Sequence, residues 1–514
     1  MSARTTSGSY RTACRSSGPR SVIPGRNFLA RDAAPLVLSS AASLSSPLSL
    51  VLLILAAFAL RAAGLHYQSF WLDEVDAIAL ARAPIHEQLR RLVQIGENGP
   101  LYFLLLRPWL ALAGTSEYGL RFLSVVCSTL AIVVCAALVR ALLELELAPG
   151  PTPWPSPRPS SRPGWLRSLP VATALLLCLS PYAVWYSQDG KMYALYLLLA
   201  LLSHYSFVAG WRQGGWTAWL GYVAVGSLLL YVHLFGALVL AANSVAGLLL
   251  CFRQRQGRAG FALATAALTL PYAPLALWQK DVLLRGAYVG YQPVDAASAA
   301  LALAEQFTLR LAWRPPVTAW LPFASLALAG AWALRSVPVS RMLLLAWLLV
   351  PFAGTMALQG RVPVFRDRYL TPMVVPLFVF IAAGLLWLLA TRPGRYAEGT
   401  RWIERTAGIL PGVLLAGYVV GAWAYALVHR PPNADFRSAA ALVRSLAGPD
   451  DQIGFLAGYA ERPFAWYYAA PYRRVELPYT NYPGMTCGQS PARCAGARTS
   501  GWYAGRIGCG TAAI

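Results

Sequence analysis

Runs of about 20 apolar residues recur along most of this chain, which is the length that an α-helix needs to cross the ~30 Å hydrocarbon core of a bilayer. Of the 514 residues, 57% are hydrophobic and 12% are charged, and the mean hydropathy is +0.49. Backbone that is exposed to lipid must form its hydrogen bonds within its own segment, and a helix does so. The sequence therefore predicts an all-α polytopic membrane protein with about eleven transmembrane helices.

The basic leader before the first span predicts that the N-terminus lies in the cytoplasm, by the positive-inside rule. Arginines in most of the predicted cytoplasmic links agree, whereas Arg361, Arg366 and Arg368 fall on the outer side. A cleaved signal peptide is the alternative for the first span, but no small-residue cleavage site follows it. We expect spans at about 48–66, 121–142, 169–186, 192–209, 215–232, 234–251, 260–278, 317–334, 342–359, 370–390 and 407–427.

The segments between and before the spans have their own character. Residues 1–47 are rich in Ser, Arg, Pro and Gly, which predicts a disordered basic N-terminal region. Residues 48–430 form the predicted transmembrane domain. Its first outer loop contains two helical patterns, at 76–93 and at Leu101–Ala113, that are too short or too charged to span and are expected to lie at the membrane interface.

Two further regions are expected outside the membrane. Outer loop 279–316 contains an apolar helical stretch, which is typical of a lid or an interfacial helix. Residues 431–484 predict a small extracytoplasmic α/β segment, with a helix at 435–446 and strands at 452–457 and 474–477 that a Pro- and Tyr-rich link joins. The patternless residues 485–514 are expected to be a disordered tail.

The formal net charge of +22 is carried almost entirely by arginine, since Lys191 and Lys280 are the only lysines. No basic helix with interleaved aromatic residues occurs outside the predicted spans, so we expect no nucleic-acid partner. Arginines near lipid headgroups can instead bind lipid phosphates. The five histidines are scattered without zinc-ligand spacing, and Cys127, Cys135 and Cys178 lie in apolar runs as expected for small core residues.

Three carboxylates, Asp73, Glu74 and Asp76, occur within one stretch of four residues that follows the first span. Acidic residues at a membrane edge are costly to place and are often functional. Phe70 and Trp71 precede them and suit the membrane–water interface. The structural alternative is a solvated loop in which Asp73 caps a helix.

Two further clusters are predicted at the same outer face. Residues 180–193 form a turn between two spans and contain Gln188, Asp189, Lys191 and Tyr193, which are either site residues or a hairpin with aromatic anchors and solvated charges. Arg366, Arg368 and Tyr369 stand at the entry of a late span. They are either phosphate ligands or interfacial anchors.

Together these clusters suit one kind of chemistry. A carboxylate can act as a general base or bind a divalent cation, and arginine binds phosphate oxygens through two parallel hydrogen bonds. Transfer of a sugar from a lipid phosphate to an acceptor hydroxyl would use both. The alternative is a transporter or flippase of lipid-linked sugars, although the charges gather at one face rather than at mid-span and no inverted repeat is visible. A structural scaffold would have no need of such a cluster.

Four ordered motifs carry a resemblance to a known family. They are Phe-Trp-Leu-Asp-Glu at 70–74, Asn-Gly-Pro-Leu-Tyr at 98–102, the run from Ser180 to Tyr193, and Arg-Asp-Arg-Tyr-Leu-Thr-Pro at 366–372. Over residues 48–430 the chain resembles the C-type integral-membrane glycosyltransferases, and most of all the protein O-mannosyltransferase and aminoarabinose-transferase-like bacterial enzymes. Each motif alone is weak, and the ordered set is what makes the resemblance specific.

The resemblance implies an inverting transferase that uses a polyprenyl-phosphate-linked sugar. It implies that Asp73 is the general base, that Glu74 supports it, and that Asp189 is a second acid where relatives often carry Glu. Arg121 would bind the donor phosphate, with Arg366 and Arg368 as further contacts. Asn98-Gly99 replaces the His-Pro of many relatives, so a role of that histidine is not inherited. Other site candidates are Asp76, Tyr102, Gln188, Lys191, Tyr193 and Tyr369.

The expected partners are the polyprenyl-phosphate sugar donor, membrane lipid, and an acceptor that is a glycan, a lipid or a protein. Carboxylates and phosphate are compatible with Mg²⁺ or Mn²⁺ held by Asp73, Glu74 and Asp189, although no spacing demands a metal. The expected location is the bacterial cytoplasmic membrane, with the active site on the extracytoplasmic side.

Overall fold

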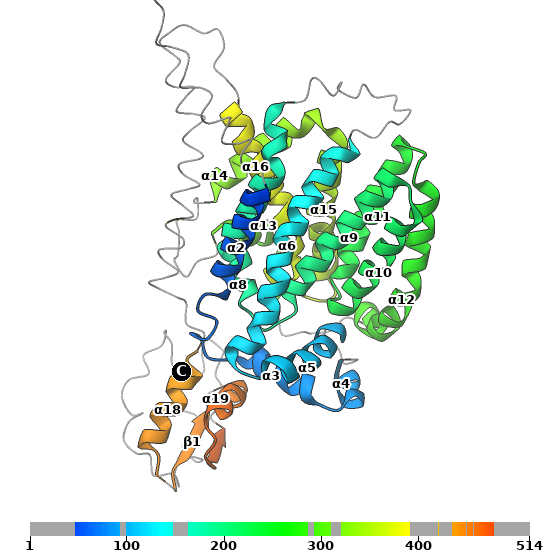
Figure 1. Cartoon of the computed structure of the whole chain (residues 1–514). Helices are drawn as coiled ribbons and strands as arrows, with labels where there is room; N and C mark the ends of the chain where they lie inside the picture. The colour runs from blue at the N-terminus through cyan, green and yellow to red at the C-terminus, as the bar shows by residue number, and fades with distance from the viewer. Residues whose placement is uncertain are drawn as a thin grey trace, which may run out of the picture.

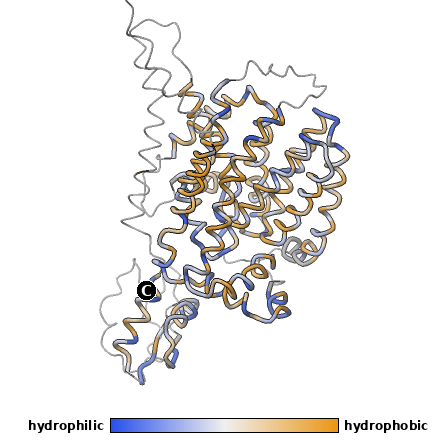
Figure 2. The backbone as a smooth tube through the Cα atoms, in the orientation of Figure 1, coloured by the Kyte–Doolittle hydropathy of each residue, from blue (hydrophilic) through white to orange (hydrophobic). Residues whose placement is uncertain are grey.

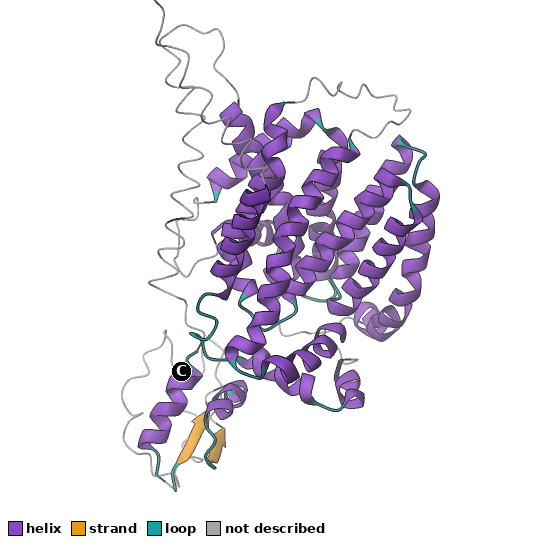
Figure 3. Cartoon of the chain, in the orientation of Figure 1, coloured by secondary structure: helices purple, strands orange, loops and turns teal. Residues whose placement is uncertain are grey.

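The computed structural model describes residues 47–92, 99–146, 163–285, 292–309, 320–390, 420, 434–448, 450–455 and 457–476. Its long helices form a bundle in which neighbours lie side by side (Figure 1). Three short helices and the C-terminal segment lie together at one end of the bundle (Figures 1 and 3). The chain is thus a multi-pass helical membrane protein with very little sheet, as the apolar runs predicted.

Ten of the eleven predicted spans are helical, and the eleventh, 407–427, lies outside the described residues except for Val420. Six described helices are long and apolar enough to cross a membrane, and a bent pair makes a seventh. Hydrophobic residues predominate along the helices of the bundle, and polar residues gather towards the helix ends (Figure 2). The bundle helices are α2 (Pro47–Ala62), α6 (Glu117–Leu145), α7 (Leu169–Leu179), α8 (Pro181–Ser187), α9 (Tyr193–Gln213), α10 (Trp216–Val232), α11 (Gly236–Arg253), α12 (Arg258–Arg285), α14 (Leu321–Ala333), α15 (Pro338–Gln359) and α16 (Val374–Ala390).

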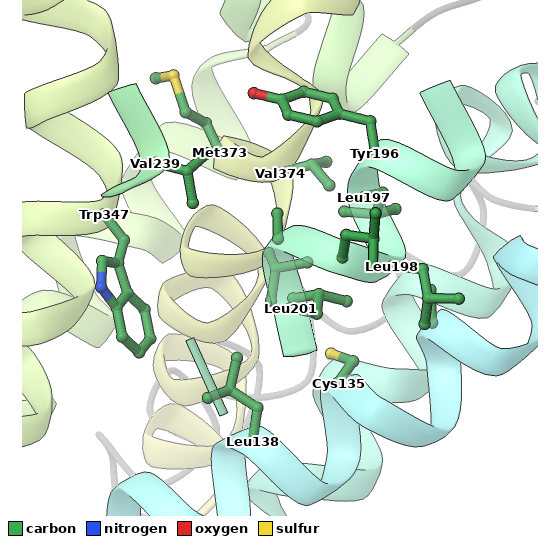
Figure 4. Close-up of a cluster of buried hydrophobic side chains, with 14 of the residues drawn as sticks. Cys135, Leu138, Tyr196, Leu197, Leu198, Leu201, Val239, Trp347, Met373 and Val374 are labelled. Carbon is green, nitrogen blue, oxygen red and sulfur yellow. The ribbon is translucent and has the colours of Figure 1, made fainter. Parts of the chain in front are cut away.

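Helices α6 and α9 pack together in the middle of the bundle (Figure 1). A buried hydrophobic cluster contains Cys135 and Leu138 of α6, Leu201 of α9 and Trp347 of α15 (Figure 4). Cys127 and Cys178 are buried as well, which confirms that these cysteines are core residues.

Helices α14 and α16 approach so closely that glycine is required at the contact. A Cβ atom on Gly330 would lie 1.8 Å from the Phe380 carbonyl oxygen, and one on Gly384 would lie 2.0 Å from the Leu326 carbonyl oxygen. Small residues at such crossings let helix backbones touch inside a membrane, where apolar side chains gain nothing by leaving lipid. This pair of glycines fixes α16 and the segment that enters it.

Helices α7 and α8 meet at a bend of 61°, which Pro181 causes. Proline has no N–H, so the carbonyl of Leu177 loses its helical donor. The fully buried Arg61 of α2 supplies the missing donors, because its guanidinium donates to the carbonyls of Leu177 at 3.0 Å and Cys178 at 3.1 Å and to Ser128 Oγ at 2.8 Å. An arginine buried in the bundle thus replaces the backbone hydrogen bonds that the bend removes.

The first outer loop folds into α3 (Leu72–Arg82), α4 (Ile85–Leu92) and α5 (Leu101–Ala113), as interfacial helices were predicted there. The first of them begins earlier than predicted, at Leu72 rather than 76. The reason is a capping box in which the Glu74 carboxylate accepts a hydrogen bond from the Trp71 N–H. Asp73 and Glu74 therefore lie in the first helical turn and not in a loop, and Trp71 rather than Asp73 is the N-cap.

Outer loop 279–316 contains α13 (Ala296–Leu309), in agreement with the helical stretch expected in that loop. Asp295 starts this helix, because its carboxylate accepts hydrogen bonds from the N–H groups of Ala297 and Ser298, both at 3.0 Å. The rest of the loop between 285 and 320 lies largely outside the described residues.

The C-terminal segment contains α18 (Phe436–Leu446), β1 (Gln452–Phe455), α19 (Glu461–Tyr467) and β2 (Arg473–Glu476). The two strands are parallel, with Gln452 paired to Arg473. Parallel strands need a crossover connection, and α19 provides it where only a link was predicted. The Pro- and Tyr-rich composition suggested a link, but aromatic residues such as Phe464 and Tyr468 are buried in the core of this segment. The predictions for residues 1–46 and 485–514 lie outside the described residues.

We predict that Arg61→Met lowers the stability of the folded protein by about 1–3 kcal/mol, because the carbonyls at the α7–α8 bend lose their donors in a region without water. Arg61→Lys keeps the charge with fewer donors and should fall between Arg61→Met and the wild type. Thermal unfolding in detergent micelles measures the difference. Unfolding of Arg61→Met at or above the wild-type temperature would contradict this role of Arg61.

Candidate active site

Five of the predicted site residues line one cavity of about 250 Å³ at the end of the bundle that carries α3 to α5, namely Glu74, Arg121, Gln188, Asp189 and Arg368. They come from α3, the start of α6, the α8–α9 turn, and η4, a 3₁₀ helix at Asp367–Met373. The lining residues are Gln68, Trp71, Glu74, Arg121, Trp185, Tyr186, Gln188, Asp189 and Arg368.

Glu74 and Arg121 form a buried ion pair across the floor of this site, with 1% and 4% of their side chains exposed. Arg121 Nε donates to Glu74 Oε1 at 2.7 Å, and Nη2 donates to Oε2 at 2.6 Å. Gly190 N–H donates to the same Oε1 at 2.9 Å. Two parallel bonds between guanidinium and carboxylate are the strongest form of this pair. Glu74 therefore links three elements, α3, α6 and the α8–α9 turn.

Arg121 has no donor to spare for a phosphate in this arrangement. Its Nη1 donates to the carbonyls of Leu65 at 2.6 Å and Gln68 at 2.9 Å, and Nη2 also donates to Ser69 O at 3.2 Å. With the two bonds to Glu74, all five N–H groups of the guanidinium are used. The geometry favours a role for Arg121 in holding Glu74 and the chain before α3, and the phosphate role inferred from the resemblance would require some of these bonds to break.

Glycine is required at position 190 because the turn passes directly over this ion pair. A Cβ atom there would lie 2.5 Å from Leu120 Cδ2 and 3.0 Å from Glu74 Oε1. Ser124 Oγ donates to Asp189 O at 2.7 Å and so ties the turn to α6. The turn that carries Asp189 is thereby fixed against α6 and α3.

Asp73 lies in the first turn of α3 with 31% of its side chain exposed. Its Oδ2 atom lies 3.7 Å from Arg368 Nη1, and Arg368 lines the cavity. The Arg368 guanidinium lies over the rings of Tyr193 at 5.5 Å and Tyr369 at 5.7 Å. A guanidinium on aromatic faces is held in orientation while its charge stays available. Arg368 thus connects Asp73 with the cavity.

The element that carries Arg368 is anchored by tyrosines of α8. Tyr186 Oη donates to Asp367 Oδ2 at 3.0 Å, and Tyr182 Oη donates to the Asp367 carbonyl at 3.1 Å. These bonds join η4 to the α7–α8 bend, so the bend positions both Arg368 and Asp189.

Asp189 is buried beside the cavity, and its Oδ1 atom has no hydrogen-bond partner within the described part of the chain. Burial, and next the negative charge of Glu74, raise the pKa of its carboxyl from 3.8 to about 7, against the opposing effect of Lys191. Asp189 therefore carries a proton below neutral pH.

The remaining predicted residues are less directly involved. Gln188 lines the cavity, and its Nε2 donates to the carbonyls of Arg61 and Ala63 at 3.0 and 2.9 Å. Tyr193 and Tyr369 support Arg368 through their rings. Four others lie away from the lining: Lys191 over the Phe103 ring, Tyr102 buried in α5, Asp76 paired with Arg462 at 2.7 Å, and Arg366 on the surface.

The three carboxylates proposed to hold a metal do not form a ligand set. Both oxygens of Glu74 are bound by Arg121, Asp73 faces Arg368, and the buried Oδ1 of Asp189 has no hydrogen-bond partner among the described residues. Among the described residues, no group of three or more His, Cys, Asp or Glu side chains is placed to hold a metal ion. We therefore assign no step to a metal.

Sequence reasoning did not select four of the lining residues, which are Gln68, Trp71, Trp185 and Tyr186. The three aromatic residues were interpreted as interfacial anchors, because Trp and Tyr are common at membrane edges whatever their role. Their positions next to Asp73 and Asp189 in sequence were the available signal.

The protein is thus a polytopic helical membrane protein with a polar cavity at the end of the bundle that carries the short helices α3 to α5. In its fold the chain is similar to ArnT from Cupriavidus metallidurans bound to undecaprenyl phosphate, with a TM-score of 0.50 at 12% identity over 82% of this chain and 85% of that one. Two weaker likenesses are apo ArnT from the same organism and the oligosaccharyltransferase AglB from Archaeoglobus fulgidus in complex with an inhibitory peptide and a dolichol-phosphate. For ArnT the TM-score is 0.47 at 11% identity over 86% of each chain, and for AglB it is 0.46 at 13% over 88% of this chain and 62% of that one.

Comparisons of the sequence with protein-family models and with curated proteins find no match. The likeness to ArnT is one of fold, and it agrees with the fold that the four sequence motifs implied.

We predict that Arg121→Met destabilises the protein by about 3–5 kcal/mol, because it leaves the buried Glu74 carboxylate without its partner. Adding Glu74→Gln should restore part of the loss, since no uncompensated charge then remains. Thermal unfolding of the two variants in detergent tests this. Equal stability of Arg121→Met and the wild type would show that the pair contributes little.

The raised pKa of Asp189 predicts a pH-dependent stability. The folded protein keeps this proton up to about pH 7, whereas an unfolded Asp loses it near 3.8, so between these values the folded state binds more protons and its stability falls as pH rises. Asp189→Asn removes this loss. We expect the melting temperature of Asp189→Asn, relative to wild type, to rise as the pH goes from about 4 to about 8. A constant difference would contradict the buried, protonated state.

Proposed function

We propose that this protein is a membrane glycosyltransferase that moves a sugar from a polyprenyl-phosphate donor to an acceptor hydroxyl, with Asp73 as general base. One observation carries the proposal: the three acids of the first motif have different partners. Glu74 forms a buried ion pair with Arg121, Asp76 is paired with Arg462, and Asp73 faces Arg368, which lines the cavity. Asp73 is thus the acid of this motif that is placed to meet a substrate.

The reaction follows from a carboxylate and a guanidinium that lie side by side. Asp73 accepts the proton of the acceptor hydroxyl while the oxygen of that hydroxyl forms a bond to the anomeric carbon. The bond from that carbon to the phosphate oxygen breaks, and polyprenyl phosphate leaves with the electron pair. Arg368 lies where it can neutralise the charge of the departing phosphate. A single displacement of this kind inverts the anomeric centre.

Asp189 has a separate role in this proposal. Its carboxyl, protonated below about pH 7, can donate a hydrogen bond from its unpartnered side to a sugar hydroxyl or a phosphate oxygen. Arg121 positions Glu74 and the start of α3. The donor phosphate is assigned to Arg368, because the guanidinium of Arg121 is fully engaged with protein oxygens.

The donor and the location rest on further support. The bundle contains helices long and apolar enough to cross a membrane, and its fold is similar to that of ArnT bound to undecaprenyl phosphate. The arginine distribution favours a cytoplasmic N-terminus, which places the cavity on the extracytoplasmic side of a bacterial cytoplasmic membrane. The acceptor in this proposal is the hydroxyl of a glycan, a lipid or a protein.

We predict that Asp73→Asn lowers sugar release by at least about 100-fold, because a general base contributes 10²- to 10⁴-fold to such a rate. The measurement uses purified protein in lipid with a panel of radiolabelled polyprenyl-phosphate sugars, and water stands in for an unknown acceptor. The matched control is Asp450→Asn, which makes the same change in an exposed turn far along the chain.

Near-normal turnover by a correctly folded Asp73→Asn protein would overturn the assignment of the base. Movement of the labelled lipid across sealed vesicles without bond cleavage, in both the wild type and Asp73→Asn, would instead support a transporter or flippase of lipid-linked sugars.

A further inference from the structure

The C-terminal segment does not line the cavity, yet it contacts the stretch that leads into α3. Residues 66–73 lie between two sets of hydrogen bonds. On the bundle side Arg121 binds the carbonyls of Leu65, Gln68 and Ser69. The C-terminal segment binds the same stretch through different atoms. The chain before Asp73 is thus held by two parts of the protein that are more than 300 residues apart.

Tyr467, at the end of α19, makes the central contact of this second set. Its hydroxyl accepts a hydrogen bond from Phe70 N–H at 2.7 Å and donates one to Glu117 Oε1 at 2.6 Å. Glu117 begins α6 and also accepts a hydrogen bond from Arg437 Nη2 at 2.6 Å, and Arg437 donates to the His66 carbonyl at 3.0 Å. One hydroxyl therefore connects the stretch before α3, the membrane helix α6 and the C-terminal segment.

Neighbouring contacts support the same arrangement. Ser69 Oγ donates to Ala434 O at 3.0 Å and accepts from Phe436 N–H at 3.1 Å. The fully buried Phe70 ring meets Trp466 edge-on at 5.5 Å. The same ring stacks on the Tyr467 ring at 6.4 Å, and the guanidinium of Arg121 lies 5.6 Å from its centroid. Phe70 is thus enclosed between the C-terminal segment and the buried ion pair.

The position of Phe70 makes these contacts relevant to the site. The next residue, Trp71, is the N-cap of α3 and lines the cavity, and Asp73 follows two residues later in the first turn. A helix that starts at Leu72 moves as a unit with its cap. A shift of Phe70 N–H therefore changes where the Asp73 carboxylate stands relative to Arg368.

We propose that Tyr467 is a positioning residue, through which the docked C-terminal segment holds the Asp73 carboxylate in register with the cavity. The inference rests on the proposed function for its consequence in catalysis, but the contact itself is independent of any activity. The C-terminal segment is in this view a part of the site's framework.

Tyr467→Phe tests this in the full-length protein in lipid, because it removes the hydroxyl and keeps the ring. The matched control is Tyr472→Phe, which removes a hydroxyl bonded at 3.3 Å to Glu461 inside the same segment and does not touch the loop. Two measurements are made on each variant. They are hydrogen exchange at residues 66–76, and kcat and KM for release of sugar from the donor.

We expect the amides of residues 66–76 to exchange about 2- to 10-fold faster in Tyr467→Phe, as the loss of one hydrogen bond implies. We expect kcat to fall roughly 10- to 100-fold with little change in KM, since misplacing a reacting group costs rate more than binding. Tyr472→Phe should match the wild type in both. Ser69→Ala, which removes two bonds from the loop side, should repeat the effect of Tyr467→Phe and serves if that variant does not fold.

Unchanged exchange and unchanged kcat in Tyr467→Phe and Ser69→Ala would overturn the proposal, as would equal effects from Tyr472→Phe. Faster exchange at residues 66–76 in a protein whose wild type releases no sugar would uphold the docking contact and reject the transferase function. The two inferences therefore fail by different results.

Discussion

The ion pair between Glu74 and Arg121 is the contact on which the rest of the site depends. A carboxylate and a guanidinium that are both removed from water need nearly ideal geometry to offset their lost hydration. Here all five guanidinium N–H groups have acceptors, and the carboxylate also receives the Gly190 N–H. The pair therefore fixes the positions of α3, of α6 and of the turn that carries Asp189. It also separates the two adjacent acids, because Glu74 is held in the buried pair and Asp73 lies beside Arg368, which lines the cavity.

The same requirement for satisfied polar groups explains the bundle beneath the site. Inside a membrane no water can serve a backbone group that a bend sets free. At the α7–α8 bend Arg61 provides the donors. Gln188, in the turn after α8, donates to backbone carbonyls at the end of α2. The bend in turn places Tyr182 and Tyr186 against Asp367, which orients the arginine that faces Asp73. A polar network thus runs from the bundle to the cavity without a break.

The C-terminal segment extends this network on the outer side. Its two parallel strands and their crossover helix have a small aromatic core of their own. Yet its polar residues Arg437, Arg462 and Tyr467 contact the stretch before α3, α3 itself and the start of α6. If the proposed transfer reaction is correct, this segment contributes to the rate by holding the loop, and the site extends beyond the residues that line the cavity.

The sequence by itself determined the membrane fold, because apolar runs of bilayer length and the pattern of arginines act locally and leave few alternatives. It also determined which clusters meet, since acids and arginines at membrane edges are costly unless they have partners. It could not determine the partners. The difference between Asp73 and Glu74 depends on Arg121, 47 residues away from Glu74, and the docking of Tyr467 on Glu117 spans 350 residues. Such pairings depend on angles and distances of a few tenths of an ångström, which no local pattern encodes, so only the tertiary structure decided which acid is buried in an ion pair and which stays partly exposed beside Arg368.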